Sequence, residues 1–368
     1  VIAVLTACTV FLSWQFIYRP LAAESLYKRG YAAIEDARYT QSTALFDQAV
    51  NVWEKKKWYF RYARAYRGKK QYLLAETMYE RLLHRYDNDL AGGLEYATML
   101  SAELRNFEKA ETVLRRRVLD HHVNNRDGLL LLGDNFLEWA EESPGKYEDA
   151  RATYAVLIEL YGKKDVYLSR MMRYFIRIDN LAEVLPLKER LTRRGSKIEP
   201  SDLVELGGYL LDKRYMPEPG ENEALRAAIE DVRALLERAI KVAGTIPEAH
   251  YNMGRFFVYN YKNDLASAAL SESLRLFETA EPMNPRRVLI RVDAFRLLGE
   301  IRAGDMEYLK AGTLYAEGIS LYEEQRANRA VRQDPRVGVL YADYADIAYF
   351  VSNRLDEALA LYERSVAE

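Results

Sequence analysis

The sequence has little of what most enzymes and nucleic-acid-binding proteins need. It has one cysteine in 368 residues, and glycine and proline are sparse at 19 and 10. That cysteine, Cys8, lies in an apolar run at the start, so the remainder has no thiol for a disulfide, a zinc site or a nucleophile. The formal net charge is only -2, so no uniform field attracts the chain to nucleic acid. We expect no nucleic-acid partner.

The residues that are abundant point to packed helices. Hydrophobic residues make up 49% of the chain, and 28 residues are tyrosine. The four histidines show no catalytic or metal-binding spacing, and the adjacent His121 and His122 lie in a predicted turn that solvent reaches. We therefore predict a protein that is not an enzyme, with no catalytic residue, no metal site, no cofactor and no small-molecule substrate.

The first 18 residues form an uncharged apolar segment, VIAVLTACTVFLSWQFIY. As a helix with a rise of about 1.5 Å per residue it would extend about 27 Å, close to the hydrocarbon core of a bilayer, about 30 Å. The sequence predicts a transmembrane helix or signal anchor over residues 1–19. Alternatives are a cleaved signal peptide, a lipidation signal, because LTAC around Cys8 resembles the bacterial lipobox, and a buried soluble helix. The anchoring residues are predicted to be Val1, Phe11, Trp14, Phe16 and Tyr18.

A repeated pair of helices covers the rest of the chain. The second helix of each pair carries a small residue, a large one four positions on and a small or apolar one three further, as in Ser42, Phe46 and Ala49. This spacing places the three side chains on one helix face. The first helix carries a small residue three positions before an aromatic one, as in Gly133 and Phe136. The predicted packing residues are Gly30, Phe46, Ala49, Ala63, Tyr66, Ala75, Tyr79, Gly133, Phe136, Ala150, Tyr154, Gly254, Phe257, Ala311, Tyr315, Ala358 and Tyr362.

This pattern resembles the tetratricopeptide repeat family, whose helix-turn-helix unit has about 34 residues. Phe46 and Tyr79 are 33 residues apart, and Tyr79 and Leu114 are 35 apart. The resemblance implies an all-α superhelix of about nine helix pairs, with a concave face lined by first helices. We divide it into an N-terminal array over residues 23–195 and a C-terminal array with longer insertions over residues 196–368.

Departures from the repeat are concentrated in the middle of the chain. Residues 165–195 match poorly and contain Pro186, which indicates a degenerate repeat or a kink. The stretch RYMPEPGENE is predicted to be a loop, followed by one long helix over residues 222–242. Long intervals between later motifs indicate extended helices near residues 274–279 and 319–332.

Exposed side chains of first helices are the candidates for binding. The stretch KKKWYFRYARAYRGKK is strongly basic and would complement an acidic peptide, a terminal carboxylate or a phosphate group. Alternatively, its long cationic side chains only solvate a helix face. Members of the family that bind a terminal carboxylate use a Lys, Asn and Arg set; the Asn members are absent here, so that activity is not expected. The candidate residues are Lys57, Phe60, Arg64 and Arg67, and a second group, Tyr251, Arg255 and Tyr259.

These observations together predict a membrane-anchored scaffold that acts by binding other proteins of an envelope assembly. The layout is similar to the periplasmic tetratricopeptide subunits of the spirochaete flagellar collar, which implies a flagellar motor component in a bacterial inner membrane with a periplasmic body. The alternative is a lipoprotein or an accessory factor for an envelope-assembly enzyme.

Overall fold

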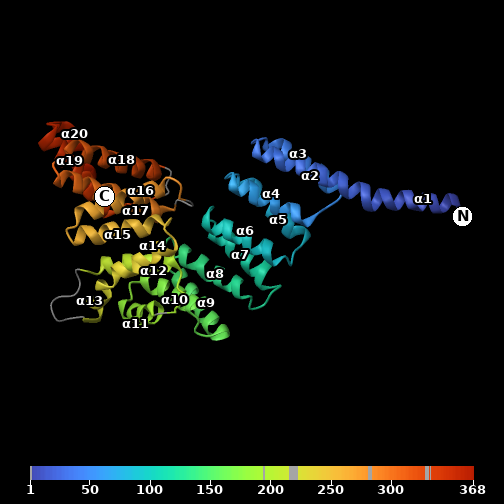
Figure 1. The fold of residues 1–368 in the computed structure, drawn as a ribbon, viewed down its shortest axis with the longest axis horizontal. Helices are drawn as coiled ribbons and strands as arrows, with labels where there is room; N and C mark the ends of the chain where they lie inside the picture. Colours follow the sequence, from blue (N-terminus) through green and yellow to red (C-terminus); the bar gives the residue numbers. More distant parts are fainter. Residues whose placement is uncertain (1, 194, 215–222, 281–283, 328–330, 332) are drawn as a thin grey trace. The chain divides into compact units, whose positions relative to one another are not determined.

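The structure is a computed structural model that describes residues 2–193, 195–214, 223–280, 284–327, 331 and 333–368. The described residues form helices and short turns without a strand. The chain divides into two compact units, Val1–Leu157 (unit 1) and Ile158–Glu368 (unit 2). The predicted boundary after residue 195 lies inside unit 2, because helices on both sides of it share one core. Figure 1 shows the helices along the chain.

Unit 1 is a series of helix pairs that follow an exposed N-terminal helix. The helices of a pair are in contact, α8 and α9 through Gly133 and the ring of Tyr154, and consecutive pairs of this unit also touch. Its elements are α1 (Ile2–Ser13), the π-helical turn η1 (Trp14–Tyr18), α2 (Arg19–Glu35), α3 (Tyr39–Val52), α4 (Lys56–Gly68), α5 (Tyr72–Arg85), α6 (Leu90–Ala102), α7 (Phe107–Val113), the π-helical turn η2 (Leu114–Leu119), α8 (Arg126–Trp139) and α9 (Lys146–Tyr161), which continues past the end of the unit.

Unit 2 continues the same arrangement. With the pairs of unit 1, its helices complete nine successive pairs among the described residues. Its elements are α10 (Asp165–Arg177), α11 (Leu181–Thr192), α12 (Pro200–Asp212), α13 (Glu223–Glu230), α14 (Val232–Val242), α15 (Pro247–Tyr259), α16 (Asn263–Phe277), α17 (Pro285–Gly304), α18 (Tyr308–Ala327), α19 (Pro335–Asp346), the π-helical turn η3 (Ile347–Val351) and α20 (Leu355–Ala367).

Local sequence signals set the helix ends. Asn125 caps α8 by accepting a hydrogen bond from the backbone N–H of Gly128, and Asn284 does the same for Arg287 in α17. Proline occupies the first turn of four unit 2 helices, where its missing N–H costs no hydrogen bond. Within most pairs the chain reverses through one residue in the left-handed conformation. These residues are Ala37, Lys70, Arg105, Asp179, Tyr261, Met306 and Asn353.

The core between helices α2, α3 and α4 is rich in aromatic rings. The ring of Phe46 lies 4.7 Å from that of Tyr62 and 5.1 Å from that of Tyr59, centroid to centroid. Tyr62 donates a hydrogen bond to the carbonyl oxygen of Tyr27 at 2.8 Å, which satisfies its buried hydroxyl. The helices therefore pack through rings whose polar atoms have partners.

Small residues in these interfaces make room for the rings. A side chain at Gly133 would meet the ring of Tyr154, and one at Gly254 would lie 2.6 Å from Cγ of Leu270. Of the predicted packing residues, Phe257 and Tyr362 are half-buried and the others are buried. The alternation of small and large residues therefore corresponds to contacts between helices, as the pattern predicted.

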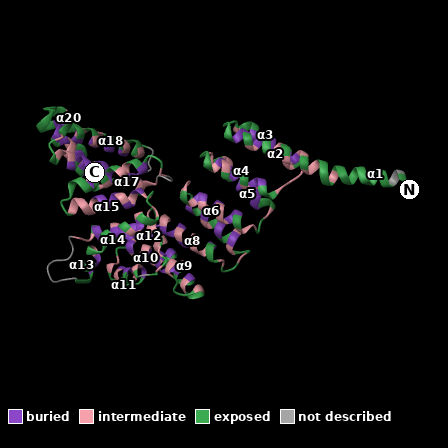
Figure 2. Ribbon diagram, in the orientation of Figure 1, coloured by how far each residue is buried: buried purple, intermediate pink, exposed green. Residues whose placement is uncertain are grey.

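The structure does not show the transmembrane helix predicted over residues 1–19. In the part of the chain that the structure describes, every helix is too short or too polar to cross a membrane. The apolar helix α1 has 12 residues and ends at Ser13, and η1 intervenes before the charged helix α2. Residues 5–13 of α1 are exposed, as Figure 2 shows. Of the predicted anchoring residues, Val1 lies outside the described residues, and Phe11, Trp14, Phe16 and Tyr18 are exposed.

The middle of the chain is more regular than its sequence indicated. The segment predicted to be a degenerate repeat contains a helix pair, α10 and α11, with Pro186 inside α11. The single helix predicted over residues 222–242 is wrong, because the described part is divided at Asp231 into α13 and α14. Most of the predicted loop, residues 215–222 with Pro217, Pro219 and Gly220, lies outside the described residues.

Candidate protein-binding surface

Helix α4 carries the first predicted binding group. It buries Trp58, Tyr62 and Tyr66 on one side, and its other side carries the basic side chains. This division follows from the spacing of its rings, which recur every four residues and so share one face. The aromatic face fixes the helix, and the basic face is left to contact neighbouring helices or a partner.

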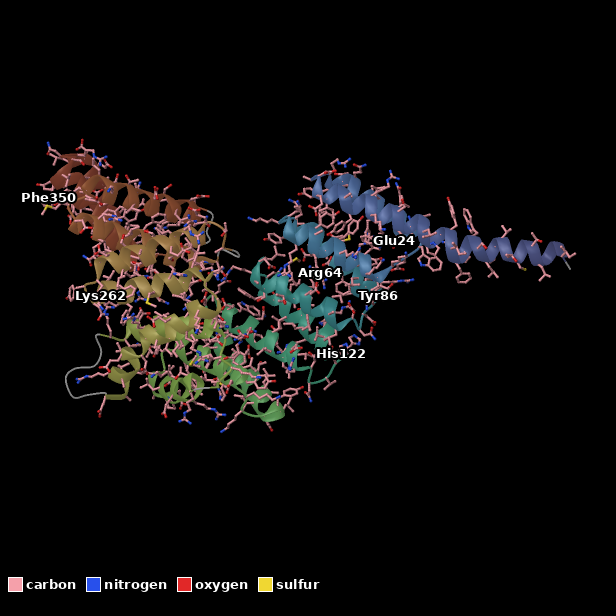
Figure 3. The ribbon with its side chains drawn as sticks, in the orientation of Figure 1. Glu24, Arg64, Tyr86, His122, Lys262 and Phe350 are labelled. Carbon is pink, nitrogen blue, oxygen red and sulfur yellow. The ribbon has the colours of Figure 1, made fainter. Side chains whose placement is uncertain are left out.

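Lys57 lies at the start of α4 and pairs with α2. Its Nζ is 3.0 Å from Oε1 of Glu24, and Lys55 and the indole of Trp58 also donate to that carboxylate, at 2.7 and 3.2 Å. Burial alone would raise the pKa of Glu24, but these three donors outweigh it and lower the pKa to about 2. Glu24, which lies on α2, is labelled in Figure 3. Lys57 therefore joins two first helices and is not free for a partner.

Arg64 and Arg67 pair with the next first helix and its turn. Nε of Arg64 donates to Glu95 on α6 at 2.9 Å, with a second contact through its Nη2, and its guanidinium lies 5.5 Å from the ring centre of the half-buried Phe60. Arg67 binds Glu103 at 2.5 Å through Nη2. The predicted cations of α4 thus connect adjacent helix pairs. These ion pairs could not be predicted from the sequence, because each acidic partner lies 31 to 36 residues away from its arginine.

Two other cationic side chains, on α2 and α4, are free to pair with a binding partner. Lys28 on α2 and Arg61 on α4 are exposed, and neither makes an ion pair with any residue that the structure describes. The guanidinium of Arg61 covers the buried indole of Trp58, 4.8 Å from the ring centre. Each lies one helical turn beyond a member of the Glu24–Lys57 pair. Tyr31, next to them, contacts the rings of Trp58 and Tyr62.

The second predicted group, on α15, is mostly inside the protein. Tyr251 is 3% exposed, and its hydroxyl donates to Oδ2 of Asp293 on α17 at 2.6 Å. Burial and this carboxylate raise the pKa of Tyr251 well above its ordinary value. The expectation that Tyr251 faces a partner is therefore corrected, because α17 covers it. Arg255 pairs with Asp212 and donates to the hydroxyl of Tyr259 at 3.1 Å, and Tyr259 is half-buried.

A buried ionic network in unit 2 was not anticipated. The carboxylate of Glu205 on α12 accepts from Arg173, Arg177 and Arg286 at 3.0, 2.8 and 3.0 Å. Burial would raise the pKa of Glu205, but these three guanidinium groups hold it well below its usual range. Arg286 comes from α17, 81 residues further on. No local spacing shows such a contact, so the sequence contained no signal for it.

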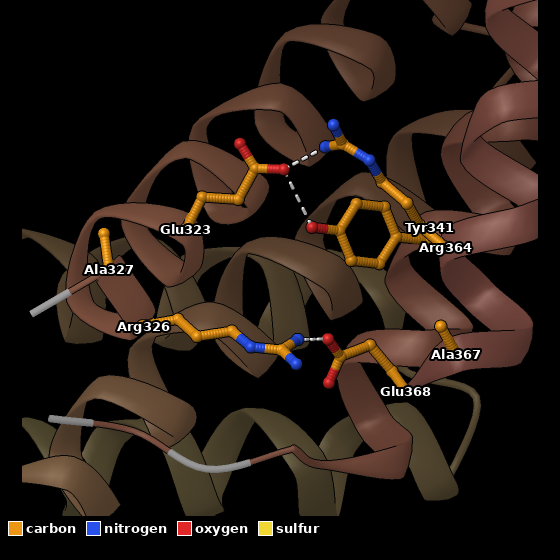
Figure 4. A pocket seen from close by; sticks show the side chains of 7 residues that line it. All are labelled: Glu323, Arg326, Ala327, Tyr341, Arg364, Ala367 and Glu368. Carbon is orange, nitrogen blue, oxygen red and sulfur yellow. Dashed lines mark hydrogen bonds and ion pairs between the residues drawn. The ribbon is translucent and has the colours of Figure 1, made fainter. Parts of the chain in front are cut away.

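One cavity lies where α18, α19 and α20 meet. It has a volume of about 400 Å³ and is lined by the seven residues drawn in Figure 4. Its charged groups pair with one another, Arg326 with Glu368 and Arg364 with Glu323, and Tyr341 donates to Glu323 at 3.0 Å. These pairs leave the lining without free charge, and we assign no ligand to it.

Metal-ligating side chains do not converge in the described residues, which contain no group of three or more His, Cys, Asp or Glu suited to a metal ion. His121 and His122 follow η2, and a ring nitrogen of His122 lies 2.9 Å from the carbonyl oxygen of Asn88. Cys8 is exposed.

Comparisons with known proteins address the fold. No family model and no curated protein sequence matches the chain. A human IFIT1 dimer with PPP-AAAA superposes with a TM-score of 0.53 at 13% identity, covering 92% of this chain and 81% of that one. A monomeric IFIT1 mutant with Gppp-AAAA gives 0.54 at 13%, covering 92% and 79%.

A tetratricopeptide repeat protein from Parabacteroides merdae gives a TM-score of 0.46 at 14% identity, covering 72% of this chain and 93% of that one. At such low identities the likeness concerns the fold alone. This chain has an all-α, tetratricopeptide-like helical repeat fold.

Proposed function

We propose that this protein is a helical-repeat scaffold that acts by binding other proteins and catalyses no reaction. The observation that supports this is its construction from nine helix pairs among the described residues, which within each unit contact mainly their neighbours in sequence. Such a series presents extended helix faces that a partner segment can follow. A fold of this kind suits protein partners in general.

The surface proposed for contact is the basic side of α4 with α2. Lys28 and Arg61 are unpaired cations among the described residues, and the half-buried ring of Phe60 and the exposed guanidinium of Arg64 lie on the same helix. The carboxylates of an acidic segment would pair with these cations, and Arg61 held over Trp58 loses little side-chain freedom on binding.

A charge reversal tests this surface on the intact protein. We expect the double change Lys28→Glu and Arg61→Glu to weaken binding of a fluorescent glutamate-rich peptide at least tenfold, measured by anisotropy at fixed salt. The matched control is Arg116→Glu, which changes an exposed arginine on η2. Equal loss in both variants, or none in either, would contradict the assignment to α4.

The apolar start of the chain supports a further part of the proposal, attachment to lipid. Residues 2–18 carry no charge, and Phe11, Trp14, Phe16 and Tyr18 are exposed. Exposed apolar and aromatic side chains in one segment favour the interface of a bilayer. Deletion of residues 2–18 should abolish flotation of the protein with phospholipid vesicles. Loss of flotation by Cys8→Ser alone would instead indicate a lipid-modified cysteine.

The setting that we propose is a multiprotein assembly of a bacterial envelope, with a flagellar motor collar as the specific case. The alternative is an accessory factor for one envelope-assembly enzyme. Purification of the tagged full-length protein from detergent-solubilised membranes separates the two. Recovery of a large motor assembly supports the collar, and recovery of a single enzyme supports the accessory factor.

A further inference from the structure

Two turns between paired helices of unit 2 expose large apolar side chains. Tyr261, in the turn between α15 and α16, is 93% exposed, and Met306, in the turn between α17 and α18, is 77% exposed. The helices that follow these turns add Leu265, which is 50% exposed, and Leu309, which is 85% exposed. We call the surface formed by Tyr261, Leu265, Met306 and Leu309 the apolar edge.

The two turns lie next to each other and inside the series of helix pairs. Arg302, near the end of α17, donates to the hydroxyl of Ser267 on α16 at 3.0 Å, and α17 packs against both α15 and α16. Helix α14 contacts α15 and helix α19 contacts α18, so the apolar edge is exposed although this part of the chain has neighbours on both sides. Single exposed apolar residues are common on protein surfaces, but four large ones in adjacent turns form a patch.

The turns themselves do not require apolar residues. Tyr261 and Met306 have positive φ angles of 54° and 62°, a left-handed conformation that favours glycine, asparagine and aspartate. The other helix pairs whose turns have this geometry carry a small or polar residue at the same position, namely Ala37, Lys70, Arg105, Asp179 and Asn353. Because a polar residue forms this turn equally well, the apolar surface of Tyr261 and Met306 is left for a contact outside the chain.

The apolar edge carries free charges of both signs. Lys262, labelled in Figure 3, and Asp264 are exposed at the start of α16, and neither makes an ion pair with a residue that the structure describes. Side chains two positions apart do not face each other on a helix, so these two do not pair within one copy. The second turn adds no free anion at Glu307, which pairs with Lys310 and Arg302.

We propose that the apolar edge is a contact between two copies of this chain related by a two-fold axis. In such a contact each copy presents the same patch, so Lys262 of one copy can pair with Asp264 of the other, and the reciprocal pair forms at the same time. An acidic or a basic partner would be matched by a surplus of one charge, whereas this patch complements itself.

The size of the patch fits a reversible dimer. Four side chains of this size and exposure offer on the order of several hundred Å² of apolar surface. A standard interface buries about 800 Å² on each partner, so we expect dimers that dissociate on dilution. The proposal goes beyond the scaffold function, because it concerns assembly of the chain with itself and does not involve α4.

Sedimentation equilibrium of the full chain in density-matched detergent measures this contact. We expect the double change Met306→Asp and Leu309→Asp to raise the dissociation constant of the dimer at least tenfold. The matched control is Leu73→Asp in unit 1, because Leu73 follows its turn by the same number of residues as Leu309 and is 76% exposed. Circular dichroism checks that the variants are folded.

An exchange of charges tests the two-fold arrangement. Lys262→Glu alone would bring two carboxylates together and Asp264→Lys alone two cations, so each should raise the dissociation constant severalfold at low salt. The combined exchange restores opposite signs and should return the dissociation constant to the wild-type value. A combined variant that is as weak as the single ones would overturn the reciprocal pairing.

Other results would also overturn the proposal. One is a wild-type chain that stays monomeric at every concentration, and another is a dimer that the Met306→Asp, Leu309→Asp variant retains, which would place the contact elsewhere. A third is a monomeric chain whose flotation with phospholipid vesicles is lost in that variant, which would assign the apolar edge to a lipid surface. Binding of the glutamate-rich peptide at α4 is measured separately, so failure of the scaffold surface is distinguishable from failure of this contact.

Discussion

The two units stabilise the same helical repeat with different interactions. In unit 1 helices α2 to α5 meet through buried rings such as Phe46 and Tyr62, and an ion pair such as that of Arg81 with Asp47 is partly exposed. In unit 2 the shared core around α12 is mainly aliphatic, with Leu210 and Leu236 fully buried, and ion pairs are buried with it. The repeat pattern therefore determines the positions of small and large residues. It does not determine whether aromatic, aliphatic or ionic contacts stabilise the interfaces between helices.

The reach of the ion pairs also differs. In unit 1, Arg64 and Arg67 bind partners one repeat away. In unit 2, Glu205 on α12 receives Arg286 from α17, past the whole α15–α16 pair. A contact that skips a pair restrains the curvature of the stack, whereas neighbour contacts restrain only one junction. The Arg286–Glu205 pair therefore links α12 directly to α17 in unit 2.

The largest expected effect comes from removing a buried charge in unit 2. Glu205→Gln removes the buried carboxylate that Arg173, Arg177 and Arg286 share, although Arg173 keeps Asp202, and should lower the free energy of unfolding by about 3–5 kcal/mol. The matched change in unit 1, Asp47→Asn, breaks a pair whose side chains are 34% and 49% exposed and should cost less than about 1 kcal/mol.

Chemical denaturation of the whole protein, with hydrogen exchange of α12 and of α5 read separately, measures both. A similar loss from the two substitutions would contradict the distinction between buried and surface pairs.

A smaller effect separates rings from aliphatic side chains at the close contacts of helices. Alanine at Gly133 would place Cβ 2.8 Å from Cδ1 of Tyr154, a rigid ring, and should destabilise unit 1 by about 1–3 kcal/mol. Alanine at Gly207 would meet Cδ2 of Leu236 at 3.0 Å, and that flexible side chain can move. The gain in helix propensity of about 1 kcal/mol then makes Gly207→Ala neutral or slightly stabilising. The melting temperatures of the two variants test this difference. Destabilisation by Gly207→Ala but not by Gly133→Ala would contradict it.

The smallest effect is a dependence on pH with opposite signs in the two units. Burial raises the pKa of Asp343 to about 6 from 3.8, with Glu300 and Asp346 adding to the rise against Arg296. The folded state therefore binds this proton more tightly, so its contribution is complete below pH 3.8 and is lost as pH rises through 6. Asp343→Asn should raise the melting temperature at pH 7, by about 2 °C, and leave it unchanged at pH 3.5.

Glu24 in unit 1 behaves in the opposite way. Its lowered pKa of about 2 gives stability above the unfolded value of 4.5 that is lost as pH falls toward 2. Glu24→Gln should therefore destabilise the protein at pH 7 and become neutral near pH 2. Melting curves of both variants across this range check the signs, and parallel curves would refute them.

Much of the fold could be predicted from the sequence. The spacing of Ala75 with Tyr79, and of Gly133 with Phe136, located helix faces that are buried in the structure. The inference is valid because residues three and four positions apart share one face of any α-helix, independently of the helix that packs against it. The break at Asp231 was missed because no proline or glycine marks it. The same periodicity showed Arg64 and Tyr251 on first helices and could not show whether a neighbour already occupied them.

The sequence by itself determined a repeat of helix pairs and the small and large residues that allow them to pack, because these depend on local spacing. Only the tertiary structure decided the use of the polar residues. It paired Lys57, Arg64 and Arg67 with carboxylates and buried Tyr251 against Asp293. The physical reason is that an ion pair or a covered face requires a second element, and the helix that supplies it lies tens of residues away in the sequence.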